Sequence, residues 1–153
     1  MSIAWNYLDK RSGTVQAIKD FSSMKFIIDS TDSTIKNVYD GMSGVGSPNM
    51  DGMPRSHDPK AGKGRIVSGI DEIDVLKERY RQAVEYMAWF VPAWEQLSDD
   101  EQFLLTTFYE HEEYSMVSPV DIICQTYNIK RSTAYNRKNK ALNHLMTLLF
   151  GKR

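Results

Sequence analysis

The sequence predicts an all-α fold in which an N-terminal helical hairpin and a long helix precede a C-terminal helix-turn-helix. Apolar residues recur at spacings of three and four along most of the chain, the period of an amphipathic helix. Residues that cap helices stand before two of these stretches. A Gly- and Pro-rich segment separates the first two helices from the rest. The chain has 153 residues, 41% of them hydrophobic and 25% charged, which is typical of an ordinary globular protein.

Two helices are expected before the Gly- and Pro-rich segment. Apolar spacing predicts one over residues 4–20 and a second over residues 24–42. The stretch "DSTDST" at 29–34 is rich in residues that cap or break helices, so the second helix is expected as one helix that could break there. Residues 41–64 then hold six Gly and three Pro, which predicts a linker, serving either as a hinge or as a functional segment.

A long helix is expected after the linker, because apolar residues follow one another at spacings of four and three with only Lys77 interrupting them. The stripe consists of Ile66, Ile70, Ile73, Tyr80, Val84, Met87, Val91 and Trp94. Such a seam packs either on the chain's own hairpin or on a second copy, and the sequence leaves both open. Pro92 is expected to kink or end this helix near Phe90, and the aromatic residues Trp89, Phe90 and Trp94 are expected in the core.

Two further helices begin at capping signals. Ser98 precedes Glu101 by three residues, which is the spacing of a capping box. The same signal recurs at Ser118, with Asp121 three residues after it. Pro119 lies between them, at the first helical position, where proline is favoured. The second of these helices is expected to end near residue 127, just before the short segment "NIKR".

A last helix follows that turn, because large residues return at helical spacing. These residues are Tyr135, Leu142, Leu145, Leu148 and Leu149. Three helices within about 55 residues, the last two joined by a short turn, form a helix-turn-helix outline.

Charge divides this outline into two halves. Residues 95–129 carry eight carboxylates and no Lys or Arg, whereas residues 130–153 carry seven Lys or Arg and no carboxylate, in a chain of net charge -1. A run of like charge is usually a solvated face. In a helix-turn-helix, however, the second helix enters the DNA major groove and flanking cations neutralise phosphates. The predicted DNA-binding residues are Lys130, Arg131, Ser132, Thr133, Tyr135, Asn136, Arg137, Lys138, Asn139 and Lys140.

The C-terminal segment also resembles region 4 of bacterial sigma factors, in which an "LS..E" helix precedes a helix-turn-helix that ends in "AL..L", here Ala141, Leu142 and Leu145. With the upstream segments "AWNYLDKR", "IKDFSSMKFII", "GVGSP" and "EYMAWF.PAW", the whole chain is similar to phage-encoded transcriptional regulators of the ArpU and RinA type. The resemblance implies a sigma region 4-like helix-turn-helix, double-stranded DNA as partner, and host RNA polymerase as a further partner.

The expected function is that of a sequence-specific DNA-binding regulator of phage or prophage genes. In this interpretation residues 95–153 form the DNA-binding domain, and residues 1–94, with their linker at 41–64, pair two protomers or contact polymerase. The alternative is the DNA-recognition subunit of a phage packaging machine, similar to a small terminase. A dimer would favour the regulator, and a ring of many copies the packaging subunit.

Other classes of protein receive no support from the residues. No catalytic or metal-binding constellation stands out, so neither an enzyme nor a cofactor is expected. The lone Cys124 forms no intramolecular disulfide. No apolar stretch is long enough to span a membrane, and the N-terminal segment lacks the apolar core of a signal peptide. The cytoplasm of a bacterial host cell is the expected location.

Overall fold

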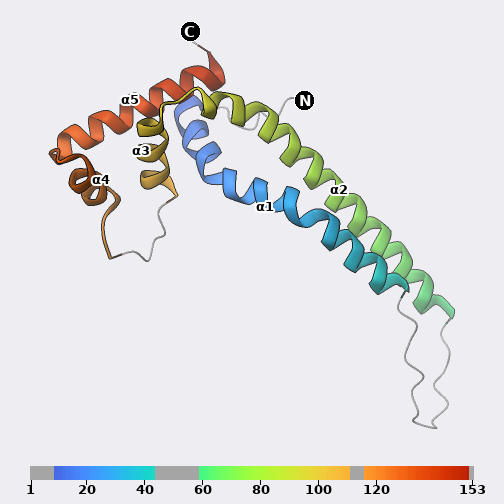
Figure 1. Cartoon of the computed structure of the whole chain (residues 1–153). Helices are drawn as coiled ribbons and strands as arrows, with labels where there is room; N and C mark the ends of the chain where they lie inside the picture. The colour runs from blue at the N-terminus through green and yellow to red at the C-terminus, as the bar shows by residue number, and fades with distance from the viewer. Residues whose placement is uncertain (1–8, 44–58, 111–115, 152–153) are drawn as a thin grey trace. The chain divides into compact units, whose positions relative to one another are not determined.

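The computed structural model describes residues 9–43, 59–110 and 116–151, and every regular element within these ranges is an α-helix (Figure 1). The helices are α1 (Lys10–Ser43), α2 (Pro59–Glu95), α3 (Asp99–Tyr109), α4 (Pro119–Tyr127) and α5 (Arg131–Phe150). The all-α prediction is confirmed for these residues, with two long helices first and three shorter ones after them. The chain forms two compact units, one of residues 26–83 and one that joins the start of α1 and the end of α2 to α3, α4 and α5.

The predicted pair of N-terminal helices is wrong, because α1 is one helix from Lys10 to Ser43 with no interruption between residues 20 and 24. The helix also continues through residues 29–34. The hydroxyl groups there donate hydrogen bonds back into the helix: Ser30 to the carbonyl of Phe26 at 2.7 Å, and Thr34 to that of Ser30 at 2.9 Å. Bonded in this way, they do not compete with the helical backbone. The hairpin of the N-terminal half is therefore formed by α1 and α2 rather than by two short helices.

The linker is shorter than predicted at both ends, since residues 41–43 belong to α1 and residues 59–64 to α2. Residues 44–58, which include most of the predicted loop, lie outside the described residues. A kink or an end of this helix was expected near Phe90. The end is wrong, because α2 continues past Pro92 to Glu95. Phe90 and Ala93 are buried in the core, and their burial offsets the hydrogen bond that the proline ring removes.

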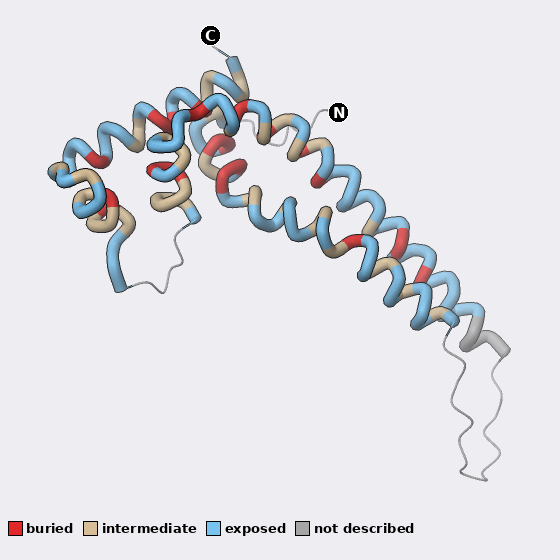
Figure 2. The backbone as a smooth tube through the Cα atoms, viewed as in Figure 1, coloured by how far each residue is buried: buried red, intermediate tan, exposed pale blue. Residues whose placement is uncertain are grey.

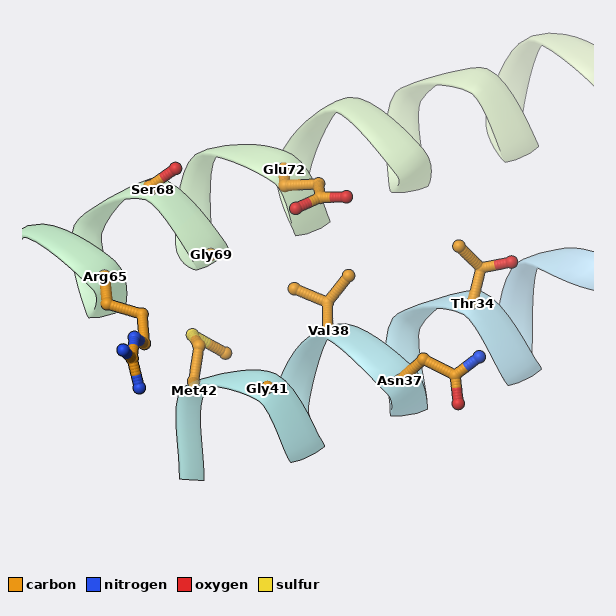
Figure 3. A pocket seen from close by; sticks show the side chains of 9 residues that line it. All are labelled: Thr34, Asn37, Val38, Gly41, Met42, Arg65, Ser68, Gly69 and Glu72. Carbon is orange, nitrogen blue, oxygen red and sulfur yellow. The ribbon is translucent and has the colours of Figure 1, made fainter. Parts of the chain in front are cut away.

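In the unit of residues 26–83, the end of α1 and the start of α2 lie side by side at Gly69 (Figure 3). The Met42 side chain points at Gly69, and a Cβ atom there would overlap the Met42 sulfur. The missing side chain thus gives Met42 its place between the helices. Ile73 and Ala83 of α2 and Thr31 of α1 are also buried.

The second unit has a core to which four helices contribute. Its largest buried side chains are Tyr86 and Phe90 of α2, whose rings stack with centroids 5.3 Å apart. The Tyr86 hydroxyl donates a hydrogen bond to the backbone carbonyl of Ala17 in α1. The other buried members are Ile18, Ala93, Leu97, Leu105, Ala141, Leu142 and Leu145. As expected, Phe90 is fully buried, and Trp89 and Trp94 pack against this core.

The predicted apolar stripe of α2 is only partly buried. Ile73 is 3% exposed, but Ile66 and Ile70 are about half exposed, at 49% and 50%, and Tyr80 and Val84 are 40% and 42% exposed. Buried and exposed positions alternate along both long helices (Figure 2). The side of α2 that faces α1 therefore includes smaller residues, among them Gly69 and Ala83, and part of the apolar stripe lies outside it.

The Tyr86 hydroxyl provides a test of this core. We expect Tyr86→Phe to lower the free energy of unfolding by about 1 kcal/mol, because a buried hydrogen bond to the Ala17 carbonyl is lost while ring packing is kept. Tyr80→Phe, at an exposed position on the same helix, should change it by less than about 0.5 kcal/mol. Urea denaturation followed by circular dichroism measures both. Equal effects would contradict the role assigned to the Tyr86 hydroxyl.

Candidate nucleic-acid interface

A three-residue turn connects α4 and α5, the two helices over which the helix-turn-helix was predicted. Asn128 ends α4 in the left-handed conformation, with φ 51° and ψ 49°, and its backbone N–H donates to the Cys124 carbonyl. Asn is one of the few residues other than Gly that adopts this conformation readily. Ile129 and Lys130 complete the turn before α5 begins at Arg131. The predicted end of the first motif helix near residue 127 is confirmed.

A small apolar core holds α3, α4 and α5 together. Its buried residues are Leu104 of α3, Val120 and Ile123 of α4, and Ala134 of α5. Phe108, Cys124, Tyr127 and Ile129 pack around them, half-buried. Ala134 is small, so the first turns of α5 approach the other two helices closely. This cluster sets the position of the N-terminal half of α5.

The two predicted helix starts differ in their capping. At α3 the capping box is confirmed: the Ser98 hydroxyl accepts from the Glu101 N–H at 3.3 Å, and Glu101 accepts from the Ser98 N–H at 3.0 Å. At α4, Ser118 is the N-cap residue and Pro119 follows it, but the Ser118 side chain makes no capping hydrogen bond. The Asp121 carboxylate instead accepts from Arg131 at 2.7 Å. The predicted side-chain cap at Ser118 is therefore wrong: the Asp121 N–H donates to the backbone carbonyl of Ser118 at 2.9 Å, and the Asp121 carboxylate pairs with Arg131.

The buried residues of α5 define which of its sides faces away from the protein. Ala134, Ala141, Leu142 and Leu145 are buried, and at 100° per residue they cluster on one side of the helix. The opposite side, which we call the outward face, carries exposed Ser132, Thr133, Asn136, Lys140 and Asn143. Four of these five were predicted DNA-binding residues. Asn143 was missed, although its spacing of seven from Asn136 places it on the same side.

The other predicted residues lie at the edges of this face or beside it. Lys130, Arg131, Tyr135 and Arg137 are exposed, whereas Lys138 and Asn139 are half-buried. Arg131 is held by Asp121, and the Arg137 guanidinium lies 5.5 Å from the centre of the Tyr127 ring on α4. Such contacts fix the direction of long cationic side chains that would otherwise be free to move.

Lys138 differs from the other cations because it points toward α3. Its ammonium lies 5.3, 5.8 and 5.6 Å from the ring centres of Phe108, Tyr109 and Tyr135. Burial lowers the pKa of Lys138, and the nearby charge of Arg11 lowers it further. Three aromatic faces around one ammonium form a cation–π site. Lys138, which was predicted to contact phosphate, therefore lies at the junction of α3 and α5.

The acidic start of α3 attaches to its neighbours by hydrogen bonds. The Tyr127 hydroxyl of α4 donates to Asp100 at 2.9 Å, and Nδ1 of His144 in α5 lies 2.9 Å from Oε1 of Glu101. Although partial burial opposes it, bonding to Ser98 and His144 lowers the pKa of Glu101. The carboxylates of Asp100 and Glu101 therefore hold the start of α3 against α4 and α5.

One residue from the start of α1 joins the motif. Nη2 of Arg11 donates to Oδ1 of Asn139 at 3.2 Å, across 128 positions in sequence. Sequence spacing gave no sign of this contact, because α1 and α5 are joined only through the folded core. The structure thus adds Arg11 to the charged groups around α5.

Comparison of the chain with protein-family models, curated proteins and solved structures found no match to any of them. None of the described helices is both long and apolar enough to cross a lipid bilayer. Within the same residues, no three His, Cys, Asp or Glu side chains gather as a metal site would require. Function is accordingly inferred from the geometry of α3, α4 and α5.

Glu101 offers a test of how α3 is held. A carboxyl group whose pKa is lowered on folding stabilises the protein above its unfolded pKa, near 4.5, and that stability is lost as pH falls through the folded pKa. We expect Glu101→Gln to lower the free energy of unfolding at pH 7 by about 0.2–1 kcal/mol, the range of partly exposed ion pairs. Glutamine retains the capping box.

The difference between Glu101→Gln and the unmodified protein should shrink below pH 4.5 and disappear once Glu101 is protonated in the folded state. Glu72→Gln, at an exposed position on α2, serves as the control. Thermal denaturation over a pH series measures both variants. A difference that stays constant with pH would show that the carboxylate charge has no part in stabilising α3.

Proposed function

We propose that the protein is a sequence-specific DNA-binding regulator of transcription, with α5 as its recognition helix. The observation that carries the proposal is the outward face of α5. It is exposed and bears one cation, two amides and two hydroxyls but no carboxylate, and a short turn connects it to α4. A helix of this kind fits the major groove, where amides and hydroxyls bond base edges and cations approach phosphates.

Within this proposal the residues have different tasks. Asn136 lies at the centre of the outward face, where its amide can form two hydrogen bonds with an adenine. Ser132 and Thr133 lie one turn nearer the start of α5, which is the part of a recognition helix that commonly contacts bases. Lys140 lies one turn further along and is assigned to phosphate. Arg131 remains in the predicted set, and its release from Asp121 would make its guanidinium available to a base.

The transcriptional part of the proposal rests on the resemblance to sigma factor region 4 and to phage regulators of the ArpU and RinA type. The capping box at Ser98 and the three-helix arrangement of α3, α4 and α5 are in keeping with that resemblance. On this basis we assign phage or prophage promoters as targets and host RNA polymerase as a second partner. The packaging subunit is the alternative, and the number of copies per assembly distinguishes the two.

A dimer is proposed because part of the α2 stripe is exposed. Ile66, Ile70 and Tyr80 repeat in the three-and-four pattern of a coiled-coil seam. Asp74 and Arg81, of opposite charge and both exposed, lie seven residues apart along one flank of this stripe. In an antiparallel pair of α2 helices, Asp74 of one copy would face Arg81 of the other and join the ion pair that Arg81 forms with Glu78 of its own helix at 2.7 Å. A second copy of the chain therefore fits this stripe.

Binding to DNA is tested with duplexes selected from random or phage genomic fragments. We expect Asn136→Ala to weaken binding to the selected site by about 1–3 kcal/mol and binding to random duplex far less, because an amide contact to a base discriminates between sequences. Lys140→Ala should weaken both about equally and reduce the slope of log affinity against log salt by about one. If both substitutions weaken both duplexes alike, α5 is a charged clamp without sequence specificity.

Assembly is tested by light scattering on the purified chain. We expect the double variant Tyr80→Glu with Val84→Glu to convert a dimer into folded monomers, because two carboxylates would be buried in each seam. The control is Val75→Glu, an exposed valine on α2 nine residues from Val84 and thus about 180° around the helix. A monomeric unmodified protein at high concentration would contradict the dimer, and a ring of many copies would favour the packaging subunit.

A further inference from the structure

We propose that Arg11, at the start of α1, is a contact to the DNA backbone and that α1 thereby forms part of the DNA interface. The inference rests on the proposed function and adds a residue outside the helix-turn-helix. Arg11 is exposed, and among the described residues its side chain donates a hydrogen bond to Asn139 of α5 at 3.2 Å. A cation from the opposite end of the sequence therefore lies beside the recognition helix.

Like charges gather at this place. The positive charge of Arg11 lowers the pKa of Lys138 and acts in the same direction on Tyr109, whose pKa burial raises. The guanidinium thus lies close to the end of α3 as well as to the middle of α5. Two cations held near each other repel, and an anion placed between or beside them removes that repulsion. A DNA phosphate is such an anion.

Carboxylates do not neutralise this pair of cations within the described part of the chain. The carboxylate nearest to Arg11 in sequence, Asp9, accepts a hydrogen bond from the backbone N–H of Ser12 at 3.1 Å, at the start of α1. The ion pairs around α5 engage Arg131 and His144 instead. The positive charge of Arg11 therefore stays available to a ligand.

Arg11 lies on the side of α5 along which one of the two DNA strands would pass if α5 occupied the major groove. Asn139 lies about 60° around the helix from Asn136, whereas Arg137 lies about 100° from Asn136 in the opposite direction. Arg137 contacts Tyr127 of α4, and Asn139 contacts Arg11 of α1. The phosphates of the two strands flank a recognition helix in the major groove. Arg11 is thus placed for the strand on the side away from α4.

A structural role is the competing explanation for Arg11. Its bond to Asn139 joins two side chains near the protein surface, and such bonds contribute little to folding because water replaces them readily. A structural role predicts a change in stability without a change in salt dependence. A phosphate contact predicts a change in the salt dependence of binding without a change in stability. Measuring both properties therefore distinguishes the two roles.

The experiment measures affinity for the selected duplex and for a random duplex between about 50 and 200 mM salt, using the full chain. We expect Arg11→Ala to weaken binding to both duplexes several-fold, by the same factor, and to reduce the salt slope by about one. Arg11→Lys keeps the charge and should retain most of the affinity. Lys19→Ala, an exposed cation on the same helix about 12 Å further along its axis, should leave affinity and slope unchanged.

The outcomes distinguish this inference from the function on which it depends. If the unmodified protein binds neither duplex, the proposed function fails and the inference with it. If the unmodified protein binds and Arg11→Ala keeps its affinity and salt slope, only the inference fails. An Arg11→Ala protein with a lowered melting temperature and an unchanged slope also overturns the inference, since Arg11 would then hold α1 against α5 and no more.

Discussion

The packing of the Tyr86 and Phe90 rings against α1 and α5 is the constraint on which the C-terminal unit depends. These side chains fill the space between Ala17 and Ile18 on one side and Leu142 on the other, so that one core joins segments from both ends of the chain. Fully burying side chains of this size stabilises a fold by about 1.5–3 kcal/mol each. Helices α3 and α5 therefore share their core with the start of α1 and the end of α2.

This core also determines which side of α5 is available. Because Ala141, Leu142 and Leu145 are held by the large core and Ala134 by the small one, α5 has no freedom to rotate about its axis. The outward face is thus fixed before any DNA is bound. A preformed face loses little conformational entropy on binding. The same packing brings the start of α1 beside Asn139, which is how Arg11 comes to lie near α5.

Much of the C-terminal half could be predicted from the sequence, because its signals are local. A capping box, a proline after an N-cap and the spacing of leucines each act within about four residues, and they located α3, α4 and α5 to within a few residues. The N-terminal half was harder. Two helices were predicted where α1 is a single one, and the hydroxyls at 29–34, which could have broken a helix, bond to its own carbonyls. The contact of Arg11 and the position of Lys138 in its aromatic site depend on long-range packing, which periodicity does not encode.

The uneven distribution of charge now has a physical explanation. Two acidic residues that precede α5 contact it: Asp121 pairs with Arg131, and Glu101 lies 2.9 Å from His144. Attraction between these carboxylates and the groups on α5 favours the observed orientation of the helix over an inverted one. Within the described residues, no carboxylate pairs with Arg137 or Lys140, so this part of α5 carries a local positive charge although the net charge of the chain is -1. In the proposed function, such a charge speeds the encounter with DNA, which is a polyanion.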